Sequence, residues 1–341
     1  MQFKIQIAPD DLEFVADDAQ TILEAALAAG LLLPYSCRDG ACGACKAELL
    51  QGSVCGVPEN TPALSADDLA RGQTLLCQAK PLSDLHIRPR SIARVGDIPA
   101  RKMPCRVQTL ERAADDVMIV TLKLPSSEQF RFRAGQYVDF LLSDGRRRSF
   151  SIASPPEVTD TIELHVRKVA GGHFTGHVFE TMKARDILRM EGPLGSFFLR
   201  EDSDRPIILL AGGTGFAPIK SIVEHAIATG CTRPMRLYWG ARNRAGLYQD
   251  TLARSWETRL PDFRYTPVLS EATPEEAWQG RSGLVHHVVM EDYPDMQLHE
   301  VYACGAPAMI EVARQDFFGR CKLPEAHFHA DAFTFANDSH N

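Results

Sequence analysis

Hydrophobic and polar positions alternate in three different ways along the chain, which divides it into three blocks. In the first block, Phe3–Ile7 alternates apolar and polar side chains, the pattern of a half-buried strand. An apolar run over Thr21–Ala29 follows, and Gly30 stands where a helix would end. We therefore expect this block to combine strands with a short helix, ahead of a loop rich in cysteine and glycine.

The second block contains short segments rich in β-branched and aromatic residues, each bounded by Gly, Pro or Asp. The predicted strands are Val117–Leu124, Gln136–Leu142, Ser149–Ala153 and Ile162–Val169. Short strands separated by turn residues at this spacing are typical of antiparallel sandwiches and barrels.

The third block, from about residue 205, alternates continuous apolar strands with amphipathic helices. The predicted strands are Ile207–Ala211, Met235–Trp239, Tyr265–Leu269, Val301–Cys304 and His327–Ala330. The predicted helices are Pro218–Ala228, Leu247–Thr258, Gly283–Met290 and one that begins after Pro307. This alternation predicts a parallel sheet with helices on both faces.

A segment rich in proline and basic residues, Arg88–Pro104, separates the first two blocks and is interpreted as a linker. A length of 341 residues suits two or three domains better than one. The predicted division gives domains at residues 1–92, 105–202 and 203–335, a linker at 93–104 and a tail at 336–341.

Charge and composition exclude two classes of partner. The net charge of −7 argues against nucleic-acid binding. The longest apolar run, Ile22–Pro34, contains Glu24 and is too short to span a bilayer, so we expect no membrane partner. A signal-peptide pattern is also missing at the N-terminus, which favours a cytoplasmic location. There, the nine cysteines are expected to be reduced thiols and metal ligands.

Four of the cysteines have the spacing of an iron–sulfur site. Cys37, Cys42 and Cys45 form a C-x4-C-x2-C pattern, and Cys77 can supply a distant fourth thiolate. The small residues between them let the backbone wrap closely around an anionic cluster. A zinc site is the alternative, but structural zinc favours paired C-x2-C knuckles. The spacing therefore predicts a plant-type [2Fe–2S] cluster.

The segment Leu33–Gly43 resembles the ferredoxin domains of three-domain NADH-dependent oxygenase reductases. The resemblance is close to reductases of Rieske-type oxygenases and to CDP-6-deoxy-delta-3,4-glucoseen reductases, and it extends over nearly the whole chain. It implies a multidomain fold. The parts would be a β-grasp [2Fe–2S] ferredoxin, an antiparallel six-stranded flavin-binding β-barrel and an α/β parallel-sheet nicotinamide-binding domain.

Two segments of the second block resemble flavin motifs of the ferredoxin–NADP reductase superfamily. Arg148–Ser151 resembles the R-x-Y-S motif, with Phe150 in the place of tyrosine. By this resemblance Arg148 would bind a flavin phosphate, Phe150 would pack on the flavin, and Ser151 would hydrogen-bond near its ring and take part in catalysis. A second family element is matched by His165, Val166, Arg167, Gly171, Gly172 and Thr175. The arginines at residues 146–148 would, taken alone, more often form a solvated turn. The order and spacing of the two motifs favour a flavin instead. We expect FAD rather than FMN.

A glycine-rich turn lies where the first strand of the third block leads into a helix. Such a turn lets a pyrophosphate approach the helix N-terminus. It lacks the G-x-G-x-x-G spacing but resembles the G-G-T-G-x-x-P turn of the same superfamily. The residues expected to bind the nicotinamide coenzyme here are Gly212, Gly213, Thr214 and Gly215.

Three further residues are implicated by resemblance alone. Cys304 and Gly305 begin a segment like the family's C-G-x-P turn, which would place the Cys304 thiol beside the reactive carbon of the nicotinamide. A cysteine at a strand end is otherwise more often a small buried hydrophobic residue. Phe333 resembles the family's terminal aromatic residue, which would lie against the flavin and act in catalysis; the alternative is a core aromatic.

The choice of coenzyme rests on two opposed indications. Arg242 and Arg244 follow the second strand of the third block, and their charge alone would suit the 2′-phosphate of NADPH. The reductases that the chain resembles mostly use NADH despite basic residues in this region. We therefore expect NADH, with NADPH as the alternative.

Together the three blocks predict an enzyme that passes electrons from NADH through FAD to the [2Fe–2S] cluster and on to a protein acceptor. The expected acceptor is a terminal oxygenase, in particular a Rieske-type ring-hydroxylating one. A CDP-6-deoxyhexose dehydrase and a di-iron hydroxylase are the alternatives. A redox-sensing iron–sulfur module without turnover is the alternative outside the enzymes. The reductase is expected to be a monomer.

Overall fold

The structure is a computed structural model, which describes residues 1–58, 61, 63–94, 98–127 and 129–334. The predicted tail at 336–341 lies outside the described residues. The chain forms two compact units: Met1–Pro99 with Gly195–Phe197, and Ala100–Leu194 with Phe198–Asn341. No helix among the described residues is long and apolar enough to cross a bilayer.

The first unit is a small sheet with a helix packed on it. The five strands, in the order β2-β1-β8-β4-β6, are β1 (Gln2–Ile7), β2 (Leu12–Asp17), β4 (Lys46–Gln51), β6 (Gln73–Leu75) and β8 (Leu85–Pro89). Strands β1 and β8 are parallel, whereas the other neighbours are antiparallel. This mixed sheet with a crossing helix is the expected β-grasp fold. The remaining elements are β3 (Leu31–Leu32), β5 (Val54–Cys55), β7 (Lys80–Pro81), β9 (Ala93–Arg94) and α2 (Ala66–Ala70).

Helix α1 (Ile22–Ala28) begins and ends where the sequence predicts. The Thr21 hydroxyl accepts a hydrogen bond from the backbone N–H of Glu24, and the Glu24 side chain accepts one from the backbone of Thr21, a complete capping box. Ile22 and Leu23, the first two residues of the helix, have fully buried side chains. The helix therefore supplies part of the core of the first unit.

The first part of the second unit is a six-stranded antiparallel barrel. In sheet order β13-β12-β15-β10-β11-β14, the strands are β10 (Arg101–Ala114), β11 (Val117–Lys123), β12 (Tyr137–Leu141), β13 (Arg147–Ser151), β14 (Thr161–Arg167) and β15 (Ile187–Leu194). A bridge between Ile152 and Leu164 joins the two edge strands. Helix α3 (His173–Glu180) packs its apolar face on the barrel core, which contains Phe174 and Val178.

Residues Arg101–Pro104, which the sequence analysis placed in the linker, instead begin strand β10. Met103 and Cys105 are buried and the residues between and beside them are exposed, so the segment alternates as a strand does. Pro104 is tolerated because β10 pairs only with β15 at this position, and its ladder with β11 begins at Arg106. The proline and the basic residues concealed this alternation.

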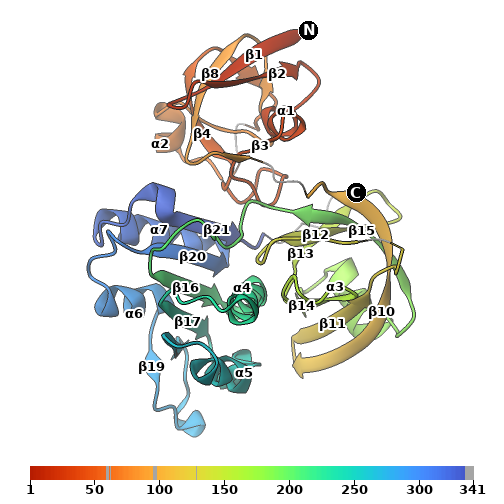
Figure 1. Cartoon of the computed structure of the whole chain (residues 1–341), viewed down its shortest axis with the longest axis vertical. Helices are drawn as coiled ribbons and strands as arrows, with labels where there is room; N and C mark the ends of the chain where they lie inside the picture. The colour runs from red at the N-terminus through yellow and green to blue at the C-terminus, as the bar shows by residue number, and fades with distance from the viewer. Residues whose placement is uncertain (59–60, 62, 95–97, 128, 335–341) are drawn as a thin grey trace. The chain divides into compact units, whose positions relative to one another are not determined.

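The second part of this unit is a parallel sheet in the order β19-β18-β17-β16-β20-β21. The strands are β16 (Ile207–Gly212), β17 (Met235–Ala241), β18 (Phe263–Leu269), β19 (Arg281–Ser282), β20 (Glu300–Gly305) and β21 (Phe328–Ala332). The helices are α4 (Phe216–Thr229), α5 (Asp250–Ser255), α6 (Val285–Asp292) and α7 (Pro307–Gly319). Figure 1 shows α6 and α7 on the opposite face of the sheet from α4 and α5.

The strand order reverses on either side of β16, because the chain runs outward to β17 and β18 and later returns to β20. In parallel sheets, ligands bind at the carboxyl ends of the strands at such a point. The turn after β16 and the end of β20 both lie there, since Ala211 pairs with Cys304. The topology therefore brings together the two segments that the sequence predicts to hold the nicotinamide.

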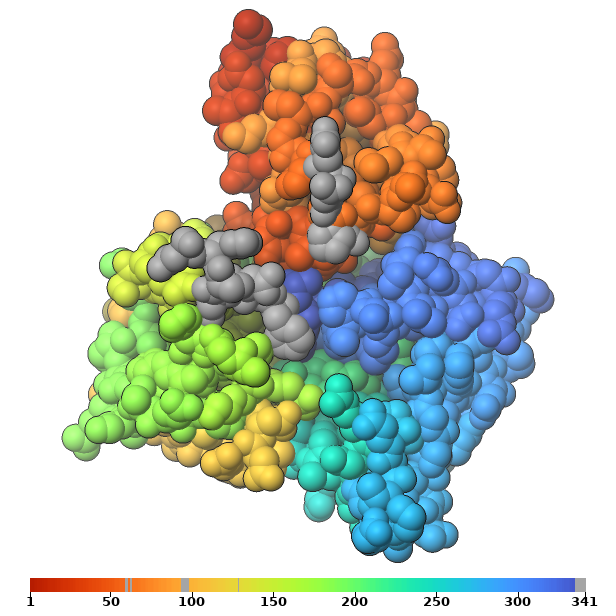
Figure 2. Space-filling view, turned by 180° about the vertical axis from the view of Figure 1, so that it is seen from behind, coloured from red at the N-terminus to blue at the C-terminus, as the bar shows by residue number. Residues whose placement is uncertain are grey.

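The barrel and the α/β domain lie side by side, as Figures 1 and 2 show, and polar contacts join them. The Ser221 hydroxyl of α4 donates a hydrogen bond to the carbonyl of Ser154, over 2.8 Å. Lys220, one residue earlier, lies 3.2 Å from the carboxylate of Glu163 on β14. Both α4 side chains are buried, so this helix is anchored to the barrel at its first turns.

Candidate functional site

The four cysteines that the sequence singles out lie together in the first unit. The sulfurs of Cys45 and Cys77 are 3.2 Å apart, and the backbone N–H of Cys42 points at the sulfur of Cys37 from 3.3 Å. The two pairs are close enough to act electrostatically on one another. Cys45 and Cys77 are buried, whereas Cys37 and Cys42 are partly exposed.

The backbone of the cysteine loop has the curvature that an anionic cluster needs. Arg38, Gly40 and Gly43 have φ values of +64°, +84° and +69°, in the left-handed region. These residues turn the chain so that backbone N–H groups face sulfur, including the N–H of Ala44, which lies 3.5 Å from the sulfur of Cys42. The loop therefore fits a [2Fe–2S] cluster, whose sulfur atoms are stabilised by N–H donors.

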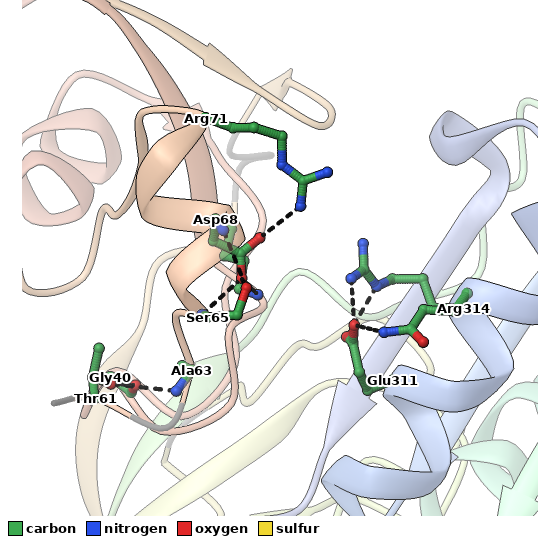
Figure 3. Close-up of polar contacts among 10 residues, drawn as sticks. Gly40, Thr61, Ala63, Ser65, Asp68, Arg71, Glu311 and Arg314 are labelled. Carbon is green, nitrogen blue, oxygen red and sulfur yellow. Dashed lines mark hydrogen bonds and ion pairs between the residues drawn. The ribbon is translucent and has the colours of Figure 1, made fainter.

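A buried ion pair joins the end of this loop to helix α2. Lys46 follows the last cysteine of the loop, and its ammonium lies 2.8 Å from the carboxylate of Asp68 on α2. Asp68 also closes the cap of α2 with Ser65, and Arg71 approaches its other oxygen (Figure 3). Burial opposes ionisation, but hydrogen bonds from Lys46 and Ser65 hold the pKa of Asp68 well below its ordinary value. Sequence analysis missed this pair; the one local signal that could have been used is the capping-box spacing of Ser65 and Asp68.

The first flavin motif lies on strand β13. Phe150 is half-buried and contacts Phe140 and Phe174, with ring centroids 5.8 and 5.4 Å away. Arg148 is half-buried, and its guanidinium donates to the carbonyl of the preceding residue. Ser151 is buried, and its hydroxyl lies 3.3 Å from Asp331 of the α/β domain. The motif therefore joins the barrel to the end of β21.

The second flavin element begins on β14. His165 is buried, with its two ring nitrogens hydrogen-bonded to Tyr248 and Glu163 over 2.8 and 2.9 Å. Val166 belongs to the barrel core. Arg167 places its guanidinium beside Gly213, so that a Cβ at Gly213 would lie 3.1 Å from it. The arginine of the flavin element thus reaches the glycine turn of the α/β domain.

The loop between β14 and α3 contains the rest of this element. Gly171 has a φ of +72°, and Gly172 is the N-cap of α3. The Thr175 hydroxyl accepts a hydrogen bond from the backbone N–H of Val169 and donates one to the carbonyl of Gly172. In this structure Thr175 holds the loop itself in shape at the start of the helix.

Glu163 on β14 forms a polar cluster with His165 and with Lys220 of α4. Burial favours the neutral form of Glu163, yet the hydrogen bond from His165 and the charge of Lys220 lower the pKa of Glu163 to about 2. Burial lowers the pKa of His165, so its imidazole is neutral at neutral pH. Glu163 is therefore a carboxylate whose charge is stabilised only in the folded unit.

Acid is expected to weaken this unit through Glu163. Because its folded pKa, about 2, lies below the ordinary value of 4.5, the stabilisation is complete above pH 4.5 and declines as the pH falls toward 2. The shift corresponds to about 3 kcal/mol. Glu163→Gln should therefore lower the urea midpoint at pH 6 and make its fall toward pH 3 shallower than in the parent.

Tryptophan fluorescence can follow this transition, since the three tryptophans of the chain, Trp239, Trp256 and Trp278, all belong to the second unit. Glu257→Gln, which alters another carboxylate of the same unit, is the control. An identical pH dependence in the parent and in Glu163→Gln would contradict the assignment.

The glycine turn after β16 packs directly on the end of β20. A Cβ on Gly215 would lie 2.1 Å from the carbonyl oxygen of Cys304, and one on Gly212 would lie 2.6 Å from the sulfur of Met309. Trp239 donates its indole N–H to the carbonyl of Gly213 over 2.9 Å. Thr214 is buried. These contacts fix the turn at the start of α4, where its N–H groups can receive a pyrophosphate.

Cys304 lies fully buried at the end of β20. It pairs in register with Asp331 on β21, and the backbone N–H of Phe333 donates to the carbonyl of Gly305 over 2.8 Å. Burial, with the nearby Asp331 carboxylate, raises the pKa of the Cys304 thiol well above its ordinary value, so the thiol is neutral. Asp331 also contacts Ser151. The residues that the resemblance names as catalytic therefore meet around Asp331, a residue that sequence analysis did not select.

Three protein-family models match successive parts of the chain. Residues 5–82 match the 2Fe-2S iron-sulfur cluster binding domain, 104–199 the oxidoreductase FAD-binding domain and 209–315 the oxidoreductase NAD-binding domain. These matches assign a [2Fe–2S] cluster, FAD and NADH to the three parts of the chain.

Relatives match over almost the whole length. The chain is 41% identical to a CDP-6-deoxy-L-threo-D-glycero-4-hexulose-3-dehydrase reductase of Yersinia pseudotuberculosis, over 98% of this chain and 99% of the relative. It is 37% identical to reductase component 1 of a terephthalate 1,2-dioxygenase of Comamonas, over 98% of each. Among solved structures, a cytochrome P450 reductase of Amycolatopsis matches with 35% identity and a TM-score of 0.77, over 98% of this chain and 99% of that one. The chain therefore belongs to the family of NADH-dependent reductases that join a ferredoxin domain, an FAD-binding barrel and a nicotinamide-binding domain, and it is an electron-transfer enzyme.

Proposed function

We propose that this reductase supplies electrons to the terminal component of an oxygenase, with a Rieske-type ring-hydroxylating enzyme as the favoured acceptor. The observation that carries the proposal is the cysteine loop, in which Cys37 and Cys42 are partly exposed while Cys45 and Cys77 are buried. A metal cluster held in this way is accessible to a partner protein on one side and shielded on the other. The similarity to a dioxygenase reductase component over 98% of the chain supports the same acceptor class.

A CDP-6-deoxyhexose dehydrase is the second candidate acceptor. The 41% identity to a reductase of such a dehydrase over 98% of the chain favours it. Reconstitution tests the choice: the purified reductase, NADH and either a ring-hydroxylating oxygenase component or a dehydrase are combined, and product is measured. Turnover with the oxygenase alone supports the first proposal, whereas turnover with the dehydrase alone replaces it with the second.

The side chains have separable tasks in this proposal. When bound, the flavin accepts a hydride from NADH and returns the two electrons singly to the cluster. Arg148 binds a flavin phosphate, and the glycine turn at residues 212–215 binds the coenzyme pyrophosphate. Asp331 orients the Ser151 hydroxyl, while the neutral Cys304 thiol and Phe333 keep water away from the nicotinamide side. The four thiolates of the loop hold the iron.

Two carboxylates support the choice of NADH over NADPH. Arg242 lies 3.8 Å from Glu271, and the backbone N–H of Arg244 donates to Glu276 over 2.7 Å. The Arg244 guanidinium also lies over the ring of Trp278. The arginines at the end of β17 thus have acidic neighbours, which would repel a 2′-phosphate and accept a hydrogen bond from a 2′-hydroxyl.

Glu271→Gln is accordingly expected to improve the use of NADPH. Removal of this carboxylate leaves Arg242 available to bind the 2′-phosphate. Exposed charge pairs of this kind contribute about 0.5–1 kcal/mol, which corresponds to a rise of roughly 2- to 5-fold in kcat/KM for NADPH. Ferricyanide reduction with NADH and with NADPH measures the ratio. Glu325→Gln is the control. Glu325 is an exposed carboxylate just before β21, and its replacement should leave the ratio of NADPH to NADH activity unchanged. An unchanged ratio in Glu271→Gln would count against a coenzyme role for this loop.

We also infer that the enzyme is a cytoplasmic monomer with three domains, for which the predicted bounds of 1–92, 105–202 and 203–335 are amended so that the second begins at Arg101, with β10. All nine cysteines lie within the described residues, and none of them is in a disulfide, which supports a reducing compartment. Sedimentation of the holoenzyme tests the monomer: a species of about twice the 37.7 kDa chain mass would contradict it.

A further inference from the structure

Two histidines and an aspartate converge on the face of the α/β domain formed by α6 and α7. His286 and His287 are adjacent on α6, with ring centroids 4.2 Å apart, and Asp316 lies on α7. One ring nitrogen of each histidine and one carboxylate oxygen all lie within 4.8 Å of one another. None of the three takes part in the proposed electron path.

His286 is the residue that makes this cluster unusual. Its side chain is only 3% exposed, and its Nε2 atom has no hydrogen-bond partner among the described residues. An Oδ2 atom of Asp316 lies 3.4 Å away, but the contact lacks hydrogen-bond geometry. A buried imidazole nitrogen without a partner is costly. A metal ion bound by His286 Nε2 and Asp316 Oδ2 removes that cost, because the lone pairs of the two atoms then point at the ion and not at each other.

The distance between these two atoms suits such an ion. Two ligands at 2.0–2.2 Å from a tetrahedral Zn²⁺ are roughly 3.4 Å apart. His286 and Asp316 are already at this separation, so the pair needs no large movement. His287 is exposed, and its ring can adjust to complete a third ligand.

The two carboxylate oxygens of Asp316 face different neighbours. Arg320 lies 3.4 Å from Oδ1 of Asp316, whereas Oδ2 faces His286. The Nε2 atom of His286 is buried and has no hydrogen-bond partner among the described residues, so it is placed to offer a lone pair to an ion. The arginine orients the carboxylate in the way that outer hydrogen bonds orient metal ligands.

We propose that His286, His287 and Asp316 bind one divalent transition-metal ion of the Zn²⁺ class, with water as the remaining ligand. Two imidazoles and one carboxylate suit Zn²⁺ better than Mg²⁺ or Ca²⁺, which prefer oxygen ligands. The ion would join α6, which follows the edge strand β19, to α7, which leads from β20 to β21. Its role is structural: it fixes the helix that follows the Cys304 turn.

Calorimetric titration of the FAD- and cluster-loaded full chain with ZnCl₂ tests the proposal after dialysis against a mild chelator. We expect one Zn²⁺ per chain and a rise in the thermal midpoint of the second unit, because an ion that binds only the folded state stabilises it. His287→Ala, chosen because this side chain is exposed and is not needed for folding, should weaken binding at least tenfold and abolish the rise. Asp316→Asn should act in the same direction.

Two control variants separate this cluster from adventitious binding. His177→Ala removes a histidine of α3, and Cys55→Ser removes an exposed thiol of the first unit. Both should bind Zn²⁺ as the parent does. The proposal is overturned if the parent binds no Zn²⁺, if His287→Ala retains the parent affinity, or if Cys55→Ser alone loses the ion.

Discussion

Cys42→Ser is expected to abolish electron delivery to protein acceptors while ferricyanide reduction by NADH continues. Cys42 is one of four thiolates predicted to hold the cluster, and its backbone N–H also points at the sulfur of Cys37. Replacing a metal ligand costs at least the roughly 100-fold that loss of a supporting residue can cost. Cytochrome c reduction should therefore fall by about 100-fold or more, because ferricyanide can take electrons from the flavin but cytochrome c depends on the cluster.

The matched control is Cys55→Ser. Cys55 lies in the same unit, on β5, and is exposed, but it is outside the cysteine loop. It should retain the iron content, the visible absorbance and both activities of the parent. Equal loss of the two activities in Cys42→Ser would contradict the order of the electron path. Normal iron content in that variant would contradict the ligand assignment itself.

The same loop shows how far sequence reasoning reaches in this protein. Cysteine spacing is a local property, and the small residues around it report directly on the backbone that a cluster requires, so the site could be predicted in advance. The buried pair of Lys46 and Asp68 could not, because the two residues are 22 positions apart and only the fold brings them together. Nothing in the sequence distinguishes Lys46, which is buried after the cysteine loop, from a lysine on the surface.

The strands illustrate the same difference. The parallel strands β16, β17, β18 and β20 are nearly continuous apolar runs, which the sequence shows plainly, and each was predicted to within two residues. Strand β10 was not predicted, and its first residues were assigned to the linker, because its charged outer face obscures the buried Met103 and Cys105. The alternation is present, but it becomes convincing only when β15 lies beside it.

Asp331 is the clearest case of a residue that only tertiary structure identifies. It belongs to the segment at 331–333 that resembles the family's terminal motif, but the resemblance gave a role only to the aromatic residue of that segment. The parallel register of β20 and β21 places it opposite Cys304, and the barrel brings Ser151 within 3.3 Å of it. Contacts between residues 180 positions apart cannot be read from spacing.

Gly215→Ala is expected to remove the use of NADH while leaving the barrel and the cluster intact. The φ and ψ of Gly215, −57° and −11°, are helical, so alanine meets no backbone strain there. The obstacle is packing, since the new Cβ would lie 2.1 Å from the Cys304 carbonyl oxygen and 2.5 Å from its carbon. Both are backbone atoms, so the turn has to move away from β20. A displacement of about 1 Å in a positioning segment can cost roughly 100-fold in rate.

The measurement compares two sources of electrons in the same preparation. With NADH, both ferricyanide and cytochrome c reduction should fall by about 100-fold; with dithionite, which bypasses the coenzyme turn, the visible absorbance of the flavin and the cluster should bleach as it does in the parent. Gly319→Ala is the control, because its Cβ meets nothing within 4 Å near the end of α7, and alanine there should be neutral or stabilise by about 0.5–1 kcal/mol. If Gly215→Ala retained the parent KM and kcat for NADH, the glycine turn would not be the segment that positions the coenzyme. Because Gly215 contacts the backbone of Cys304 and not its thiol, Cys304→Ala in the same assay would then show separately whether the thiol matters.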